Sequence, residues 1–203
     1  IEKGSIDMQK NDIVKVVIED VGVGGEGIGK VDGYTLFIKD AIIGDVVEAK
    51  VVKAKKNYGY ARLMNILTPS EYRVEEPVCQ VARKCGGCQI QEMKYDRQLE
   101  FKNQKVRGNL MRIGEVPEQL LDQIMEPIVG MDETEGLGGP YHYRNKAQFP
   151  IGTDKDDNIV TGFYAGRTHS IISNTNCALG VEINEQILKL ILEFMKEYHI
   201  SAY

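Results

Sequence analysis

The stretch Asp45-Val46-Val47-Glu48-Ala49-Lys50-Val51-Val52-Lys53 decides the fold of the first part of the chain. Within it, Val47, Ala49 and Val51 alternate with charged residues. This two-residue period is typical of a strand with one face buried and the other in solvent. The stretch is therefore predicted to be a half-buried β-strand.

Similar β-rich runs lie on both sides of this strand. They are Asp12–Glu19, Tyr34–Lys39 and Tyr58–Leu67, with turn signals at Asp32-Gly33 and Gly44-Asp45. Four or five short strands at this spacing are typical of a small barrel of the OB type. We expect an all-β domain over residues 12–67, ended by Thr68-Pro69-Ser70.

The glycine-rich stretch between the first two runs contains Gly22-x-Gly24-x-x-Gly27, which has the spacing of a dinucleotide fingerprint. That motif needs a following helix, whose N-terminus holds the pyrophosphate. Residues 31–38 have the pattern of a hairpin instead. The glycines are therefore predicted to form a turn or β-bulge.

Two clusters combine basic and aromatic residues. Cations that neutralise phosphates, beside rings that stack on bases, are typical of a surface for single-stranded RNA, although a solvated hairpin has the same charge pattern. The net charge of −5 excludes a protein coated in basic residues, so any nucleic-acid binding must come from such patches. The candidate RNA-binding residues are Lys53, Lys55, Lys56, Tyr58, Arg62, Tyr143, Arg144 and Lys146.

Three of the four cysteines lie close together, at Cys79, Cys85 and Cys88, and the fourth is the remote Cys177. Four thiolates with unequal spacing are the usual ligands of a [4Fe–4S] cluster, and Gly86-Gly87 would let the backbone approach it. Structural zinc usually takes two C-x2-4-C pairs, and Cys177 has no nearby partner. Two disulfides would suit a secreted protein. The pattern favours iron–sulfur, with zinc and disulfides as alternatives.

The second half of the chain has a mixed pattern. Apolar residues at helical spacing predict a helix over Tyr95–Ile113 and an amphipathic helix from Ile183 to Tyr198. Strands are expected at Met125–Met131, Tyr143–Gly152, Ile159–Ala165 and Ser170–Ser173. We therefore predict a mainly β protein with an α+β second part. Since no membrane-length apolar run or targeting segment is visible, we expect it in the cytoplasm.

The order of several motifs resembles the bacterial 23S ribosomal RNA uracil-5-methyltransferases. The resemblance spans nearly all of the chain. It is carried by Lys55-Lys56-Asn57-Tyr58, Pro69-Ser70-Glu71-Tyr72-Arg73-Val74, Cys79-x5-Cys85-Gly-Gly-Cys88-Gln89-x-Gln91, Tyr95-x-x-Gln98-Leu99-x-x-Lys102, Arg112-Ile113-Gly114, Tyr143-Arg144-Asn145-Lys146 and Cys177.

The resemblance implies an OB-like TRAM barrel over residues 1–68, a cysteine-rich cluster loop over 69–92, a helical segment over 93–124 and part of a central α+β domain over 125–203. Cys79, Cys85, Cys88 and Cys177 would hold a [4Fe–4S] cluster in this central domain, beside its antiparallel sheet and helices. The family transfers a methyl group from S-adenosylmethionine to uracil C5, and the partner would be 23S ribosomal RNA.

The resemblance also implies that the methyltransferase domain lies beyond Tyr203. No catalytic or S-adenosylmethionine-binding residue is carried over to this chain, because all four cysteines already belong to the cluster. The chain alone is expected to bind RNA and to be inactive as a methyltransferase. The apolar face of the helix over Tyr95–Ile113 would dock on the absent domain, and without that domain it would make the chain self-associate.

Three other functions fit less well. Radical methylthiotransferases also carry TRAM domains, but they need C-x3-C-x2-C, and the spacing here is C-x5-C-x2-C. A stand-alone RNA-binding module with a structural four-cysteine zinc site is the main alternative. An electron carrier would need a redox-partner surface, for which the sequence gives no signal.

Overall fold

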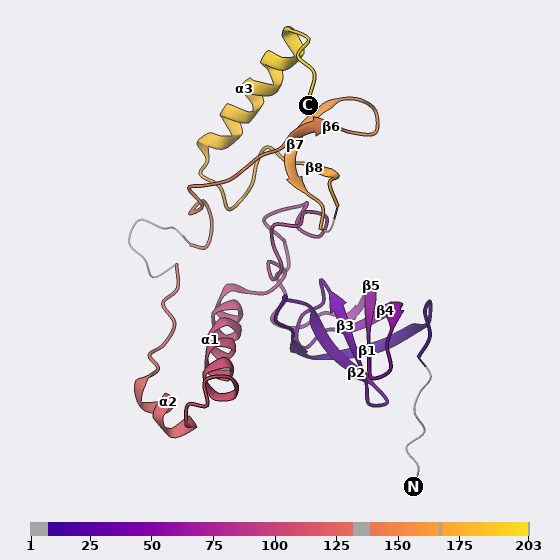
Figure 1. The fold of residues 1–203 in the computed structure, drawn as a ribbon, viewed down its shortest axis with the longest axis vertical. Helices are drawn as coiled ribbons and strands as arrows, with labels where there is room; N and C mark the ends of the chain where they lie inside the picture. The colour runs from indigo at the N-terminus through magenta and orange to yellow at the C-terminus, as the bar shows by residue number, and fades with distance from the viewer. Residues whose placement is uncertain (1–7, 132–138, 167, 203) are drawn as a thin grey trace. The chain divides into compact units, whose positions relative to one another are not determined.

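A computed structural model of the chain describes residues 8–131, 139–166 and 168–202 (Figure 1). The chain divides into two compact units. The first comprises the described residues of Ile1–Glu75 and Gln89–Ile128, and the second those of Glu76–Cys88 and Val129–Tyr203. Among the described helices, none combines the length and the apolar character needed to cross a bilayer.

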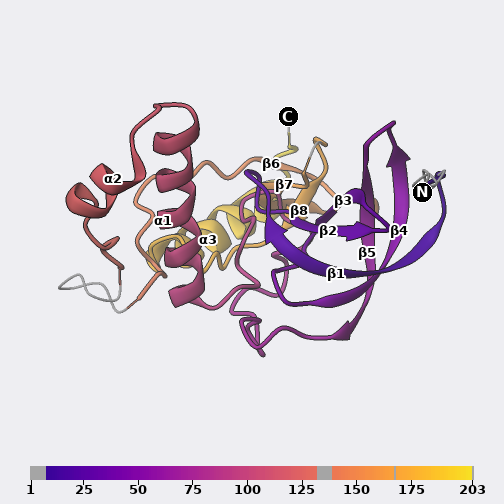
Figure 2. The same ribbon diagram turned by 90° about the horizontal axis from the view of Figure 1, so that it is seen from below.

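The first unit contains a closed five-stranded barrel (Figures 1 and 2). Its strands are β1 (Ile13–Val21), β2 (Gly27–Val31), β3 (Tyr34–Lys39), β4 (Val46–Ala54) and β5 (Tyr58–Thr68). They close in the order β1-β2-β3-β5-β4, with β3 and β5 parallel and the other pairs antiparallel. Closure removes the unpaired strand edges that an open sheet would expose. The predicted OB-like barrel is thus confirmed.

Alternate residues of the strands fill the interior of the barrel. Val47, Ala49 and Val51 of β4 are 0% exposed, and Leu36 and Ile38 of β3 meet them in the same core. The charged neighbours on β4 point away from this core. The alternation in the sequence therefore determined both the strand and the face that it buries.

The glycine stretch differs in part from its expected turn or bulge. Gly27 and Gly29 lie inside β2, where a Cβ on Gly29 would stand 2.3 Å from the carbonyl oxygen of Val17. Such close approach of two strands excludes any side chain. The irregular register lies on the partner strand β1, between Ile18 and Asp20. The hairpin predicted after the glycines is present as β2 and β3.

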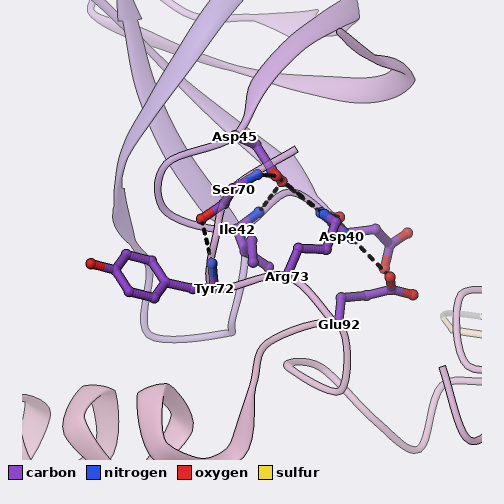
Figure 3. A network of polar contacts seen from close by, with 7 residues as sticks. All are labelled: Asp40, Ile42, Asp45, Ser70, Tyr72, Arg73 and Glu92. Carbon is purple, nitrogen blue, oxygen red and sulfur yellow. Dashed lines mark hydrogen bonds and ion pairs between the residues drawn. The ribbon is translucent and has the colours of Figure 1, made fainter. Parts of the chain in front are cut away.

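A buried ion network fastens the chain after the barrel to the loop between β3 and β4 (Figure 3). Asp45 is 0% exposed and accepts from the guanidinium of Arg73 at 2.6 and 3.1 Å, and from the backbone N–H groups of Ile42 and Ser70, each at 2.9 Å. Arg73 also donates to Glu92 at 2.8 Å. Every oxygen of the buried carboxylate of Asp45 is therefore paired, as burial of a charge requires.

Two helices complete the first unit. They are α1 (Tyr95–Arg112) and α2 (Glu118–Ile124). The predicted helix over Tyr95–Ile113 is confirmed, and Lys105 of α1 donates to the carbonyl of Val23 at 2.9 Å. None of the residues of α1 is buried, and Val106 and Ile113 are largely exposed. The docking of this apolar face stays a prediction.

The second unit is built on a small antiparallel sheet. Its elements are β6 (Ile151–Thr153), β7 (Ile159–Tyr164), β8 (Ile171–Ser173) and α3 (Ile183–Glu197), and the strand order is β6-β7-β8. The strands predicted at Ile159–Ala165 and Ser170–Ser173 and the final helix are confirmed.

Two predicted strands are wrong. Met125–Met131 forms no strand, and of Tyr143–Gly152 only the end belongs to β6. Pro127 and Pro150 explain part of this, because proline cannot donate to a sheet ladder. The segment at Arg144 instead makes one isolated bridge, to Gly180.

Candidate functional site

The fold of the second unit brings the remote cysteine toward the other three. Cys85 forms an isolated bridge with Ala165, and the N–H of Gly86 donates to the carbonyl of Tyr164 at 3.0 Å. The cysteine loop is thereby attached to the end of β7. Since β7 pairs with β8, and β8 leads directly to Cys177, the strand pair carries that thiol to the same region.

The four thiols influence one another electrostatically. The pKa of Cys88 is raised to about 11, chiefly by burial and in addition by the charges of Cys85, Cys177 and Cys79. The positive charge of Arg144 acts in the opposite direction, because it favours the thiolate. At neutral pH the thiol of Cys88 is therefore protonated, and a metal must displace this proton to bind.

Burial also raises the pKa of the Cys79 thiol. A hydrogen bond from the N–H of Val81 lowers this pKa in part. The charges of Cys177 and Cys85 then raise the pKa again. Four thiolates would repel one another here, so this group is stable as thiolates only around a cation.

Glycines in the loop make room beside Cys85, which is buried. A Cβ on Gly86 would stand 3.0 Å from the carbonyl oxygen of Tyr164, and one on Gly87 would stand 3.4 Å from the sulfur of Cys85. The N–H of Gly87 points at this sulfur at 3.4 Å.

The cysteines influence one another, but their side chains are not arranged around one point as ligands of a single metal ion would be. Within the described ranges, no group of three or more Cys, His, Asp or Glu side chains is arranged to hold a metal ion. Zinc requires four sulfurs at about 2.3 Å from one point. All four cysteines are free thiols, and no disulfide competes with a metal. The donor set therefore fits a soft metal cluster chemically.

The predicted RNA residues of the barrel lie at two places. Tyr58 and Arg62 alternate with buried residues along β5 and face outward, and Lys53 on β4 pairs in register with Tyr60. Lys55 and Lys56 lie at the turn between β4 and β5, where the N–H of Lys55 donates to the carbonyl of Tyr58 at 2.9 Å.

Sequence reasoning missed Phe37 and Lys39 of β3, which share this outward face and stand beside Tyr60 and Arg62 of β5 in register. Lys50 of β4, which belongs to the same basic stretch of sequence, stands on the other side of Arg62. The alternation of β3 already placed Phe37 on the face opposite to Leu36. What the sequence could not give is the parallel pairing of β3 with β5.

The second basic and aromatic cluster belongs to the other compact unit. Tyr143 and Lys146 are exposed there. Arg144 is less exposed, its N–H donates to the carbonyl of Leu179 at 2.7 Å, and its charge acts on Cys88. The structure thus places Arg144 in the same unit as the cysteines, where its charge acts on Cys88.

The chain is similar to known proteins along nearly its whole length. Residues 8–64 match the family model described as TRAM domain. An uncharacterized RNA methyltransferase of Clostridium tetani is 41% identical over 99% of this chain and 41% of its own length. One of Halalkalibacterium halodurans is 41% identical over 100% of this chain and 42% of its own length. The chain thus spans about two fifths of the length of these relatives.

One solved structure has a similar fold. The crystal structure of Pyrococcus abyssi tRNA (uracil-54, C5)-methyltransferase in complex with S-adenosyl-L-homocysteine matches with a TM-score of 0.62 and 22% identity. The match covers 93% of this chain and 38% of that chain. It supports the fold, including the TRAM-like barrel.

Proposed function

We propose that this chain is the RNA-binding and iron–sulfur portion of an S-adenosylmethionine-dependent methyltransferase that acts on C5 of uracil in 23S ribosomal RNA. The observation that carries the proposal is the identity along practically the whole chain to relatives named RNA methyltransferases. S-adenosylhomocysteine, which remains after S-adenosylmethionine has given up its methyl group, is bound in the crystal structure of the P. abyssi enzyme.

In this proposal the TRAM-like barrel binds the RNA. It has outward-facing cations and rings on neighbouring strands, and the chain as a whole is acidic with a net charge of −5. Because the overall charge repels RNA, binding must be local. The basic outer face of β3, β5 and β4 supplies such a place.

The cysteines would hold a [4Fe–4S] cluster with a structural role. When bound, the cluster supplies four iron–sulfur bonds that tie the loop holding Cys79, Cys85 and Cys88 to Cys177. Closing so long a loop otherwise costs conformational entropy. Arg144 would offset the negative charge of the thiolates, because it already favours the thiolate of Cys88. Sulfur donors suit iron–sulfur clusters better than they suit hard cations.

The choice of RNA can be tested by binding. We expect the chain to bind a 23S ribosomal RNA fragment about tenfold or more tightly than a tRNA transcript of similar length, measured at the same salt concentration. Equal affinities would refute the assignment to 23S RNA and leave RNA binding in place. Absence of binding to both RNAs would refute the RNA-binding role itself.

We expect this chain to transfer no methyl group by itself. The reaction implied by the resemblance needs a thiolate that attacks uracil C6, and all four cysteines of the chain belong to one group. The measurement is transfer of labelled methyl from S-adenosylmethionine to 23S RNA, with a complete relative as the positive control. Turnover by residues 1–203 would show that a cysteine of the group is free to react.

A further inference from the structure

Three aromatic rings meet on the outer face of the barrel. Phe37 and Tyr60 have ring centroids 5.6 Å apart, and Tyr58 lies 5.9 Å from each of them. We propose that these rings form a stacking platform for unpaired bases, so that the barrel selects single-stranded RNA over duplex RNA. This inference rests on the proposed RNA-binding function and names the form of RNA that the barrel takes.

The register of the strands places the rings on one face. Parallel pairing sets Phe37 beside Tyr60 and Thr35 beside Tyr58. The intervening residues Gly59 and Leu36 lie on the inner face of the barrel and are buried. Since side chains alternate strictly between faces, all three rings must point outward together.

The rings leave faces open for a ligand. Tyr58 and Tyr60 are each 39% exposed, whereas Phe37 is partly buried between them. Phe37 and Tyr60 are inclined at 32°, and Tyr58 stands nearly perpendicular to both. The pairs are tilted or edge-to-face, so no ring is stacked parallel on another. A base can therefore lie against a tyrosine face, with Phe37 supporting it.

The platform is held rigidly from inside the barrel. The buried hydroxyl of Tyr34 lies 2.5 Å from the carbonyl oxygen of Tyr58 and 2.8 Å from that of Lys55. It also accepts from the N–H of Lys55 at 3.1 Å. These contacts fix the start of β5 before any ligand arrives. Pre-organisation of this kind lowers the entropy cost of binding.

Cations surround the rings on the same face. Lys53 stands beside Tyr60 because a register shift between Val51 and Lys53 turns it outward, and Arg62 stands beside Lys50. Among the residues that the structure describes, Lys50, Lys53 and Arg62 form no ion pair, so their charges are available to phosphates. Rings with adjacent cations are the combination that binds single strands.

A duplex cannot use such a platform. Its bases are already stacked within the helix and expose only their edges and the backbone, whereas unpaired bases expose their faces. The cations would still attract a duplex through its phosphates, but the rings would add nothing. Removing a ring should therefore weaken binding to single strands and leave binding to duplexes nearly unchanged.

The test compares two probes and four variants of the 203-residue chain. The probes are a fluorescein-labelled, unstructured RNA of about ten nucleotides and the same strand annealed to its complement, since an OB fold covers about 4–16 nucleotides. The variants are Tyr58→Ala, Tyr60→Leu, Tyr60→Phe and the control Tyr198→Ala. Tyr198 is also an exposed tyrosine with an aromatic neighbour, but it follows α3 in the other unit.

We expect Tyr58→Ala and Tyr60→Leu each to weaken single-strand binding about 5- to 150-fold, which corresponds to loss of one stacked base. Tyr60→Phe and Tyr198→Ala should bind like the parent chain. Unchanged affinity of Tyr58→Ala and Tyr60→Leu, with RNA still bound by the parent chain, would overturn the platform and leave the proposed function intact. An equal loss for duplex RNA would also overturn it. If the parent chain bound neither probe, the proposed function would fail together with the platform.

Discussion

Replacing Arg73 with alanine is expected to destabilise the barrel unit by about 3–5 kcal/mol, the cost of breaking a buried ion pair. Arg73 is the common partner of Asp45 and Glu92, at 2.6 and 2.8 Å, and it also donates to the carbonyl of Asp40 at 3.0 Å (Figure 3). Its removal leaves the fully buried carboxylate of Asp45 without its countercharge. The barrel would also lose the attachment of residues 70–73 and 92.

Urea unfolding followed by circular dichroism measures this loss, and the chain offers a matched control. Arg107 also binds two carboxylates, those of Glu118 and Asp122, but both partners are largely exposed. Exposed ion pairs are weak, so Arg107→Ala should change the urea midpoint by only a small fraction of the shift seen for Arg73→Ala. Similar midpoints for the two variants would show that the buried network does not stabilise the unit.

For the proposed iron–sulfur cluster, replacing Cys177 with serine is expected to lower the iron content of the chain and to loosen the second unit. A serine hydroxyl is a hard, weakly acidic donor and a poor substitute for a thiolate. Without the proposed fourth ligand, the cysteine loop and the segment after β8 would lose the link that the cluster is proposed to make. A cross-link that closes a loop of about a hundred residues is worth about 4–5 kcal/mol in chain-entropy models.

Two measurements on chain prepared without oxygen follow this loss. Iron content should fall to near zero in Cys177→Ser, and limited proteolysis should cut the loop of residues 76–88 faster. Asn176→Ser is the matched control, because it changes the exposed neighbour of Cys177 and leaves all four thiols in place. A Cys177→Ser chain that kept its iron and its resistance to protease would exclude Cys177 as a ligand.

Local patterns predicted the parts of the fold that depend on neighbouring residues. The alternation of Val47, Ala49 and Val51 located a strand and its buried face, and helical spacing located α1 and α3. The prediction was wrong at Met125–Met131, where apolar residues resemble a strand but the chain forms none. A strand needs a second strand, and the sequence does not say where that partner lies.

The sites depend more on long-range pairing. Cysteine spacing identified the candidate ligands, but only the β7–β8 pair explains how Cys177 approaches the loop. The ring platform needs the parallel register of β3 with β5, so Phe37 could not be grouped with Tyr60 from sequence. The roles of Asp45 and Arg73 were also missed, because charged residues are normally exposed and nothing local marks these two as buried.

Iron and acid-labile sulfide per chain, measured after preparation without oxygen, test most directly whether the four cysteines hold an iron–sulfur cluster. We expect about four irons and about four sulfides per chain, with a visible charge-transfer absorption band. One zinc per chain with no sulfide would contradict the iron–sulfur proposal and support a four-cysteine zinc site.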